Sequence, residues 1–257
     1  MDGYLNVDPI KLRNLCIEIF ENEGVPKEDA YIVADSLVEA DLTNVSSHGV
    51  TRMKMYIDSI RNGGTTAKAD IKTIKKFPGG VLLNAGSSLG IVAGYKAMQM
   101  SIKIAKENGI AIASVAHSNH CGALAYYGKT SVKENVILIC STNSPSTMVP
   151  WGSREKYFGT NPICISVPTK GNPIILDMAT SVVARGKILL AEKKGVPIPE
   201  GWAIDIEGRP TTDASAALTG SVLPFGGPKG SGIAMMVDII SGVLSVEQSS
   251  TIINSIF

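Results

Sequence analysis

The chain has 257 residues, 44% of them hydrophobic, with 24 Lys and Arg against 23 Asp and Glu. This is the composition of a globular protein, and the balanced charge without a long basic run argues against nucleic acid or an anionic membrane as a partner. The four cysteines form no C-x-x-C pair, the N-terminus has no leader pattern, and no apolar stretch is long enough to span a bilayer, so we expect a cytoplasmic protein with reduced thiols.

The N-terminal quarter of the sequence predicts three helices. The first begins at Asp8-Pro9, an N-cap residue followed by proline at the first helical position, and ends at Gly24. Apolar residues at helical spacing predict a second helix after Pro26 and a third that follows Ser46-Ser47 and ends at Asn62-Gly63-Gly64.

Short β-rich runs follow, and one longer helix separates the first two. The predicted strands are 81–83, 110–115, 136–139, 162–167 and 173–176, and the helix is 91–107. No G-x-G-x-x-G occurs, so the fold class is mixed α/β (α+β) and non-Rossmann. We expect a helical N-terminal unit over 1–66, a mixed-sheet cofactor and substrate domain over 67–225, and a glycine turn with a C-terminal helix over 226–257.

The third predicted helix has a polar stripe. At about 100° per residue, His48, Arg52 and Tyr56 share one face, and apolar residues lie on the other. An arginine offers a planar fork that matches the two oxygens of a carboxylate. The alternative is an ordinary solvated helix face.

Two of the three histidines, His117 and His120, lie in AHSNHCGA, directly after a predicted strand. α/β proteins place chemistry at strand ends, and a histidine there is a natural proton carrier. Oxidation of an alcohol needs such a base, and either histidine could serve, or be structural. With His48 they could also form a three-histidine zinc site of a hydrolase, although the H-E-x-x-H pattern is absent.

The segment GGPKGSG at 226–232 opens the last helical pattern. Backbone N–H groups at a helix start, beside Lys229, favour an anion site suited to a phosphate. The order of residues is not that of a P-loop, and a plain glycine turn is the alternative.

Seven ordered blocks carry a family resemblance. They are SSHGVTRMKMY at 46–56, HSNHCGALAYY at 117–127, NSPSTMVPWGS at 143–153, YFGTNP at 157–162, LDMATSVVARGK at 176–187, GWAIDIEGRPTTD at 201–213 and GGPKGSGIAMMVDIISGVL at 226–244. Together they resemble the malate/L-lactate dehydrogenases that lack a Rossmann fold, whose relatives include ureidoglycolate and sulfolactate dehydrogenases. The resemblance implies hydride transfer between NAD or NADP and a small 2-hydroxy or 2-keto acid, such as malate or lactate.

The resemblance also implies roles for single residues. His120 matches the proton acceptor, with His48 as a second catalytic residue and His117 as a supporting neighbour. The substrate-binding positions are Arg52, Tyr56 and Ser47. The cofactor-binding positions are Ser144, Asp177, Met178, Ala179, Lys229 and Asn161, with Thr160 in the site wall. The resemblance implies a homodimer, and we expect no metal.

The C-terminal end departs from this pattern. Members of the family continue well past the glycine-turn helix, whereas this chain ends in SVEQSSTIINSIF. We therefore expect a chain shortened at its C-terminus, and the alternative to an active dehydrogenase is a catalytically defective, truncated remnant of that family.

Overall fold

The computed structural model describes residues 6–245, and its internal contacts divide the chain into two compact units. Among the described residues, unit 1 comprises 6–137 and 167–173, and unit 2 comprises 138–166 and 174–245. The C-terminal shortening predicted above concerns residues after 245, which lie outside the described range.

Unit 1 begins with the first two predicted helices, which are confirmed as α1 (Pro9–Asn22) and α2 (Lys27–Leu42). The Asp8 carboxylate caps α1 by accepting from the backbone N–H groups of Ile10 at 2.8 Å and Lys11 at 3.0 Å. The α2 helix is buried along most of its length, so it forms the centre of this helical layer.

The third predicted helix is wrong in its first half. Two 3-10 turns, η1 (Ser46–His48) and η2 (Val50–Arg52), precede the helix proper, α3 (Met53–Arg61). Gly49 breaks the helix between the turns with an extended backbone, and the Val50 N–H donates to the Asp41 carboxylate of α2 at 2.9 Å. A Cβ at Gly49 would lie 1.9 Å from the same carboxylate, so only glycine allows this approach.

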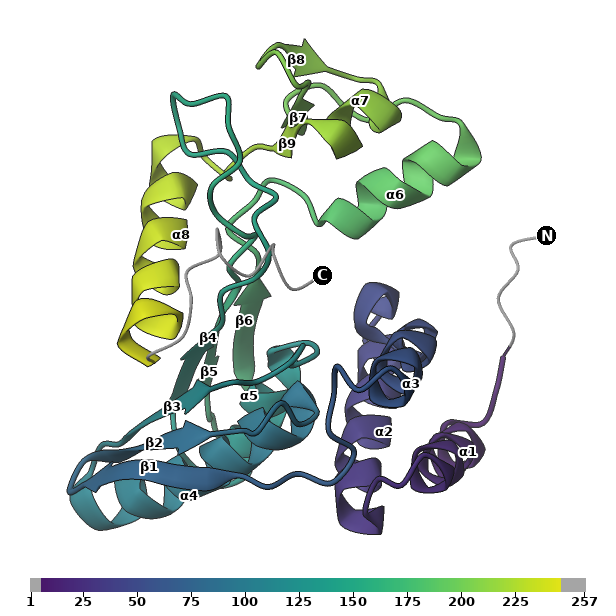
Figure 1. Cartoon of the computed structure of the whole chain (residues 1–257). Helices are drawn as coiled ribbons and strands as arrows, with labels where there is room; N and C mark the ends of the chain where they lie inside the picture. The colour runs from purple at the N-terminus through teal and green to yellow at the C-terminus, as the bar shows by residue number, and fades with distance from the viewer. Residues whose placement is uncertain (1–5, 246–257) are drawn as a thin grey trace. The chain divides into compact units, whose positions relative to one another are not determined.

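The remainder of unit 1 is a three-stranded sheet with two helices. Its strands are β1 (Lys72–Phe77), β2 (Gly80–Asn84) and β3 (Ile112–Ala116), in the order β1-β2-β3, and its helices are α4 (Gly90–Asn108) and α5 (Ala125–Val132). The β1-β2 pair is antiparallel and the β2-β3 pair is parallel. The α4 helix connects β2 to β3 and packs against the sheet through a core that includes Val81, Leu83 and Ala97 (Figure 1).

The strand β1 was not predicted. Its sequence, KTIKKF, contains three lysines, and all six residues are exposed. It therefore lacks the short β-rich run of apolar residues by which the other strands of the sheet were predicted.

Unit 2 contains two further small sheets. The strands β4 (Leu138–Ser141), β5 (Ile163–Val167) and β6 (Ile174–Met178) form one sheet in that order, with β4 and β5 antiparallel. The short strands β7 (Ala203–Ile204), β8 (Pro210–Thr211) and β9 (Ser221–Val222) form the other, in the order β8-β7-β9. The helices are α6 (Arg185–Lys194), α7 (Ala214–Thr219) and α8 (Pro228–Ser241), followed by the turn η3 (Val243–Ser245).

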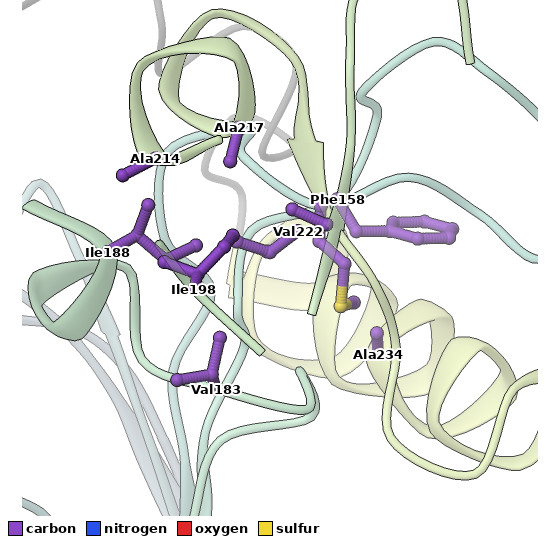
Figure 2. Packing of buried hydrophobic residues seen from close by; sticks show 10 residues of the cluster. Phe158, Val183, Ile188, Ile198, Ala214, Ala217, Val222 and Ala234 are labelled. Carbon is purple, nitrogen blue, oxygen red and sulfur yellow. The ribbon is translucent and has the colours of Figure 1, made fainter. Parts of the chain in front are cut away.

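The core of unit 2 lies among these elements (Figure 2). Met148 and Ile188 are fully buried, and Phe158 and Val222 are nearly so. Ala234 of α8 belongs to the same cluster, so this core fixes the helix that follows the glycine turn.

The predicted fold class is confirmed. Helices alternate with three small sheets, and antiparallel pairs occur in each of the units, which is not the parallel, doubly wound arrangement of a Rossmann fold. Within residues 6–245, no helix combines the length and the apolar character that a bilayer crossing requires.

Candidate active site

The histidine loop, residues 117–124, leaves the end of β3 and lies against the start of α4. The Asn119 side chain anchors it by donating to the Ser87 carbonyl at 2.8 Å, and the Ser87 N–H donates to the His117 carbonyl at 2.8 Å. A Cβ at Gly90 would lie 1.9 Å from the Asn119 carbonyl oxygen, so the loop needs glycine at the first position of α4. These contacts fix the backbone immediately before His120.

His120 is in contact with side chains from the segment 46–61. Its Nδ1 lies 2.6 Å from the Tyr56 hydroxyl and 3.3 Å from the Gly122 backbone N–H. The rings of His48 and His120 are stacked, with centroids 5.6 Å apart and an interplanar angle of 21°. Tyr56 is only 3% exposed. The structure therefore brings His48, Tyr56 and His120 together from two distant stretches of sequence.

Burial and positive charge set the protonation of this cluster. Burial first, then the neighbouring His48 and Arg52, lower the pKa of His120 to about 4. Burial and the Arg52 charge also lower the pKa of His48, and burial raises the pKa of the Tyr56 phenol. Near neutral pH the cluster therefore consists of two neutral imidazoles and a protonated phenol.

Arg52 and Ser47 complete the group of predicted residues in unit 1. The Arg52 Nε donates to the Ser47 carbonyl at 2.6 Å, and the Ser47 hydroxyl lies 3.0 Å from Nδ1 of His48. The Arg52 Nε and the His48 Nδ1 are thus used to order the turns, and the Arg52 Nη1 also contacts the Met55 sulfur at 3.8 Å. The guanidinium charge still acts on both histidines. A cation beside two neutral imidazoles is suited to hold a carboxylate and to exchange a proton.

Tyr56 differs from the expectation for a polar stripe. The helical period placed Tyr56 on a face that either binds a ligand or is exposed to solvent. In the structure, Tyr56 is instead the buried residue of α3. The reason is its hydroxyl, which finds a partner in His120 and can therefore leave water at little cost.

His117 does not join the other two histidines. It is exposed and has a left-handed backbone, with φ of 51°. Within residues 6–245, no three His, Cys, Asp or Glu side chains form a group that could hold a metal ion. The three-histidine zinc site considered above is therefore wrong.

The residues predicted to bind the cofactor all lie in unit 2, where Asn161 connects two of their segments. The Asn161 carboxamide accepts from the Ser144 N–H at 3.1 Å and donates to the Ala234 carbonyl of α8 at 3.0 Å and to the Asp238 carboxylate at 3.4 Å. Asn161 is fully buried, with an unusual φ of 24°. Its side chain thus links the Ser144 loop to α8.

Thr180 makes a second connection, between the end of β6 and the glycine turn. Its N–H and hydroxyl both donate to the Thr160 carbonyl, at 2.8 and 2.9 Å, and its own carbonyl accepts from the Phe225 N–H at 3.0 Å. Asp177, Met178 and Ala179 immediately precede it. The four predicted cofactor segments are therefore connected within one unit.

The glycine turn differs from the expected anion site, in which free backbone N–H groups would bind a phosphate. The Gly230 N–H donates to the Phe225 carbonyl at 2.9 Å, and the Ser231 N–H donates to the Gly227 carbonyl at 3.2 Å, so these amides are used inside the turn. The features that suit a cofactor phosphate are the positive end of the 14-residue helix α8, which has no side-chain cap, and the exposed Lys229 in its first turn.

Three residues that order the site were not identified from the sequence. Asp41 holds the turn between His48 and Arg52, Gly122 donates to His120 with a φ of 73°, and Asp238 is buried beside Asn161. In the sequence, Gly122 is only a glycine in a loop and Asp41 only an acidic residue near a helix end, so neither indicated its role in the site clearly. Asp238 carried a stronger signal, since it is a charged residue in an apolar helix.

Comparisons with known proteins agree with these motifs. The family model described as malate/L-lactate dehydrogenase matches residues 7–256. Malate dehydrogenase of Pyrococcus horikoshii is 44% identical over 252 residues, which cover 95% of this chain and 70% of that protein. L-sulfolactate dehydrogenase of Methanocaldococcus jannaschii is 42% identical over 239 residues, covering 93% and 70%. The solved structure of the sulfolactate dehydrogenase from the latter organism superposes with a TM-score of 0.90 at 41% identity, over 96% of this chain and 72% of the other. The predicted resemblance is confirmed: this chain is an enzyme of the malate/L-lactate dehydrogenase family.

Proposed function

We propose that this protein transfers a hydride between a nicotinamide cofactor, NAD or NADP, and a small 2-hydroxy or 2-keto acid of the malate, lactate or sulfolactate type. The observation that carries the proposal is the cluster of Tyr56, His120, His48 and Arg52 in unit 1. It combines a neutral base with a fixed cation, which is the pair of groups that a hydroxy acid requires. Family membership adds the class of reaction.

Each group of the cluster has a distinct role in this proposal. Arg52 holds the carboxylate of the acid, because its guanidinium is a permanent cation and keeps donors beyond the Nε bonded to Ser47. His120 exchanges a proton with the oxygen on the reacting carbon, accepting it from the alcohol and returning it to the ketone. His48, stacked on His120, closes one side of the ring and limits its contact with water.

The nicotinamide cofactor supplies or accepts the hydride when it is bound. In unit 2 we assign its binding to Ser144, Asp177, Met178, Ala179, Lys229 and Asn161. Lys229 faces a phosphate, supported by its exposure at the start of α8. Asn161 acts by holding the Ser144 loop, since it is fully buried and its carboxamide is bonded to neighbouring segments. The homodimer expected from the resemblance stays a prediction.

The test is a hydride-transfer assay on the purified chain, followed by the absorbance of the reduced nicotinamide. NADH and NADPH are each paired with pyruvate, oxaloacetate and 3-sulfopyruvate. We expect turnover with at least one pair, and a loss of roughly 10²–10⁴-fold in kcat for His120→Ala. His117→Ala, which changes an exposed histidine of the same loop, is the matched control. Cofactor binding without turnover on any acid would support the defective-remnant alternative instead.

A further inference from the structure

The hydroxyl of Tyr56 is hydrogen-bonded to Nδ1 of His120 at 2.6 Å, so one of the two ring nitrogens has a side-chain partner. The second partner of Nδ1 is the Gly122 backbone N–H at 3.3 Å. A backbone N–H can only donate, so Nδ1 of the neutral ring presents its lone pair and the single proton lies on Nε2. The phenol then donates to Nδ1 as well.

Tyr56 is suited to remain a donor at all working pH values. Its side chain is 3% exposed, and burial raises the pKa of the phenol, so it stays protonated. The groups that face His120 are Tyr56 and Arg52 from the segment 50–61, His48 from η1, and the Gly122 N–H from its own loop. Among them, the Tyr56 side chain is hydrogen-bonded to the ring at Nδ1, as is the Gly122 N–H, so neither of these two partners occupies Nε2.

We propose that Tyr56 is a positioning residue that acts through His120: by holding Nδ1, it fixes the tautomer of the ring and makes Nε2 the nitrogen that exchanges a proton with the substrate oxygen. This inference rests on the proposed function and differs from the sequence-based expectation for Tyr56, which was direct contact with the substrate. A hydroxyl bonded to His120 and removed from water acts on the substrate only through the ring.

The first test needs no activity. Long-range ¹H–¹⁵N correlation spectra of protein labelled with ¹⁵N-histidine report which ring nitrogen is protonated, and the chain has three histidines, so variants at His48 and His117 assign the signals. We expect Nδ1 of His120 to be unprotonated and Nε2 to carry the proton near neutral pH. In Tyr56→Phe only the longer contact from the Gly122 N–H, at 3.3 Å, still holds Nδ1, so we expect part of the population to shift to the other tautomer. The opposite tautomer in the unchanged protein, or an identical tautomer in the variant, overturns the proposal.

The second test separates positioning from substrate binding. Tyr56→Phe is expected to lower kcat by roughly 10–100-fold, as loss of an orienting partner does, while KM for the keto acid stays within about twofold. The phenol stabilises the neutral ring, so its loss is also expected to raise the pH midpoint of kcat/KM by roughly one unit. A large rise in KM with kcat unchanged would show direct substrate contact and refute the proposal.

Tyr126→Phe is the matched control. Tyr126 is also a buried tyrosine of unit 1, and its hydroxyl bonds to Asp35 at 3.2 Å rather than to a histidine. The control is expected to leave the tautomer of His120 and the pH midpoint unchanged. If the chain shows no turnover with any substrate, the proposed function fails, while the spectra still decide the role of Tyr56.

Discussion

The protonation of His120 makes a quantitative prediction about acid stability. The pKa of this histidine falls from its ordinary value of 6.5 to about 4 in the folded chain. Between these two values the unfolded chain binds the proton and the folded chain does not, so the free energy of unfolding decreases as the pH falls from 6.5 toward 4. His120→Asn removes this contribution, and the variant should therefore lose less stability in acid than the unchanged protein.

The size of the effect follows from the same values. One pKa unit corresponds to about 1.36 kcal/mol, so at pH 5 His120 is expected to lower the free energy of unfolding by about 2 kcal/mol relative to pH 7.5. This is an upper limit, because the side chain is only partly removed from solvent and water screens the charge.

The assay is urea unfolding followed by far-UV circular dichroism at several pH values. Tryptophan fluorescence is unsuitable here, because Trp151 and Trp202 both lie in unit 2 whereas His120 lies in unit 1. His117→Asn is the control, since it changes an exposed histidine and asparagine tolerates its left-handed backbone. If plots of the free energy of unfolding against pH run parallel for His120→Asn and the unchanged protein between pH 4.5 and 7.5, the lowered pKa of His120 is refuted.

Three further variants test other parts of the site. Asn161→Ala leaves the Ser144 N–H and a carbonyl of α8 without their partner, so the free energy of unfolding should fall by about 2–3 kcal/mol in urea titrations of tryptophan fluorescence, and an unchanged midpoint would contradict this. Arg52→Gln removes the carboxylate-binding cation, so steady-state kinetics should show KM for the keto acid raised by roughly 10–100-fold, and an unchanged KM would exclude that role. Gly49→Ala places a Cβ against Asp41, so the free energy of unfolding should fall by about 1–3 kcal/mol, and kcat/KM should fall as well. A variant with unchanged stability and activity would show that the turn can adjust.

The local patterns of the sequence predicted several of the longer helices and strands. The α4 helix has apolar residues at helical spacing and ends at Gly109, whose left-handed backbone is a common helix terminator, so both its face and its end were visible. The strands β7, β8 and β9 are two residues long each, which is too short for any periodicity to appear.

The parts of the site that could not be predicted depend on contacts between distant residues. The helical period put Tyr56 on the same stripe as Arg52, but its burial depends on His120, 64 positions away in sequence. The break at Gly49 depends on Asp41 of another helix. The resemblance marked Asn161 as part of the site, whereas its bonds to both the Ser144 loop and α8 required the fold.

The lysines of β1 have a consequence for self-association. This strand is at one edge of its sheet, with Lys72, Lys75 and Lys76 exposed and an irregular register between Thr73 and Lys75. An open edge offers unpaired amide and carbonyl groups to other chains, and a row of positive charges on an uneven strand repels a second copy of itself. Acylation of these amines would remove their charge and with it this repulsion, which would leave the edge more open to pairing with another strand.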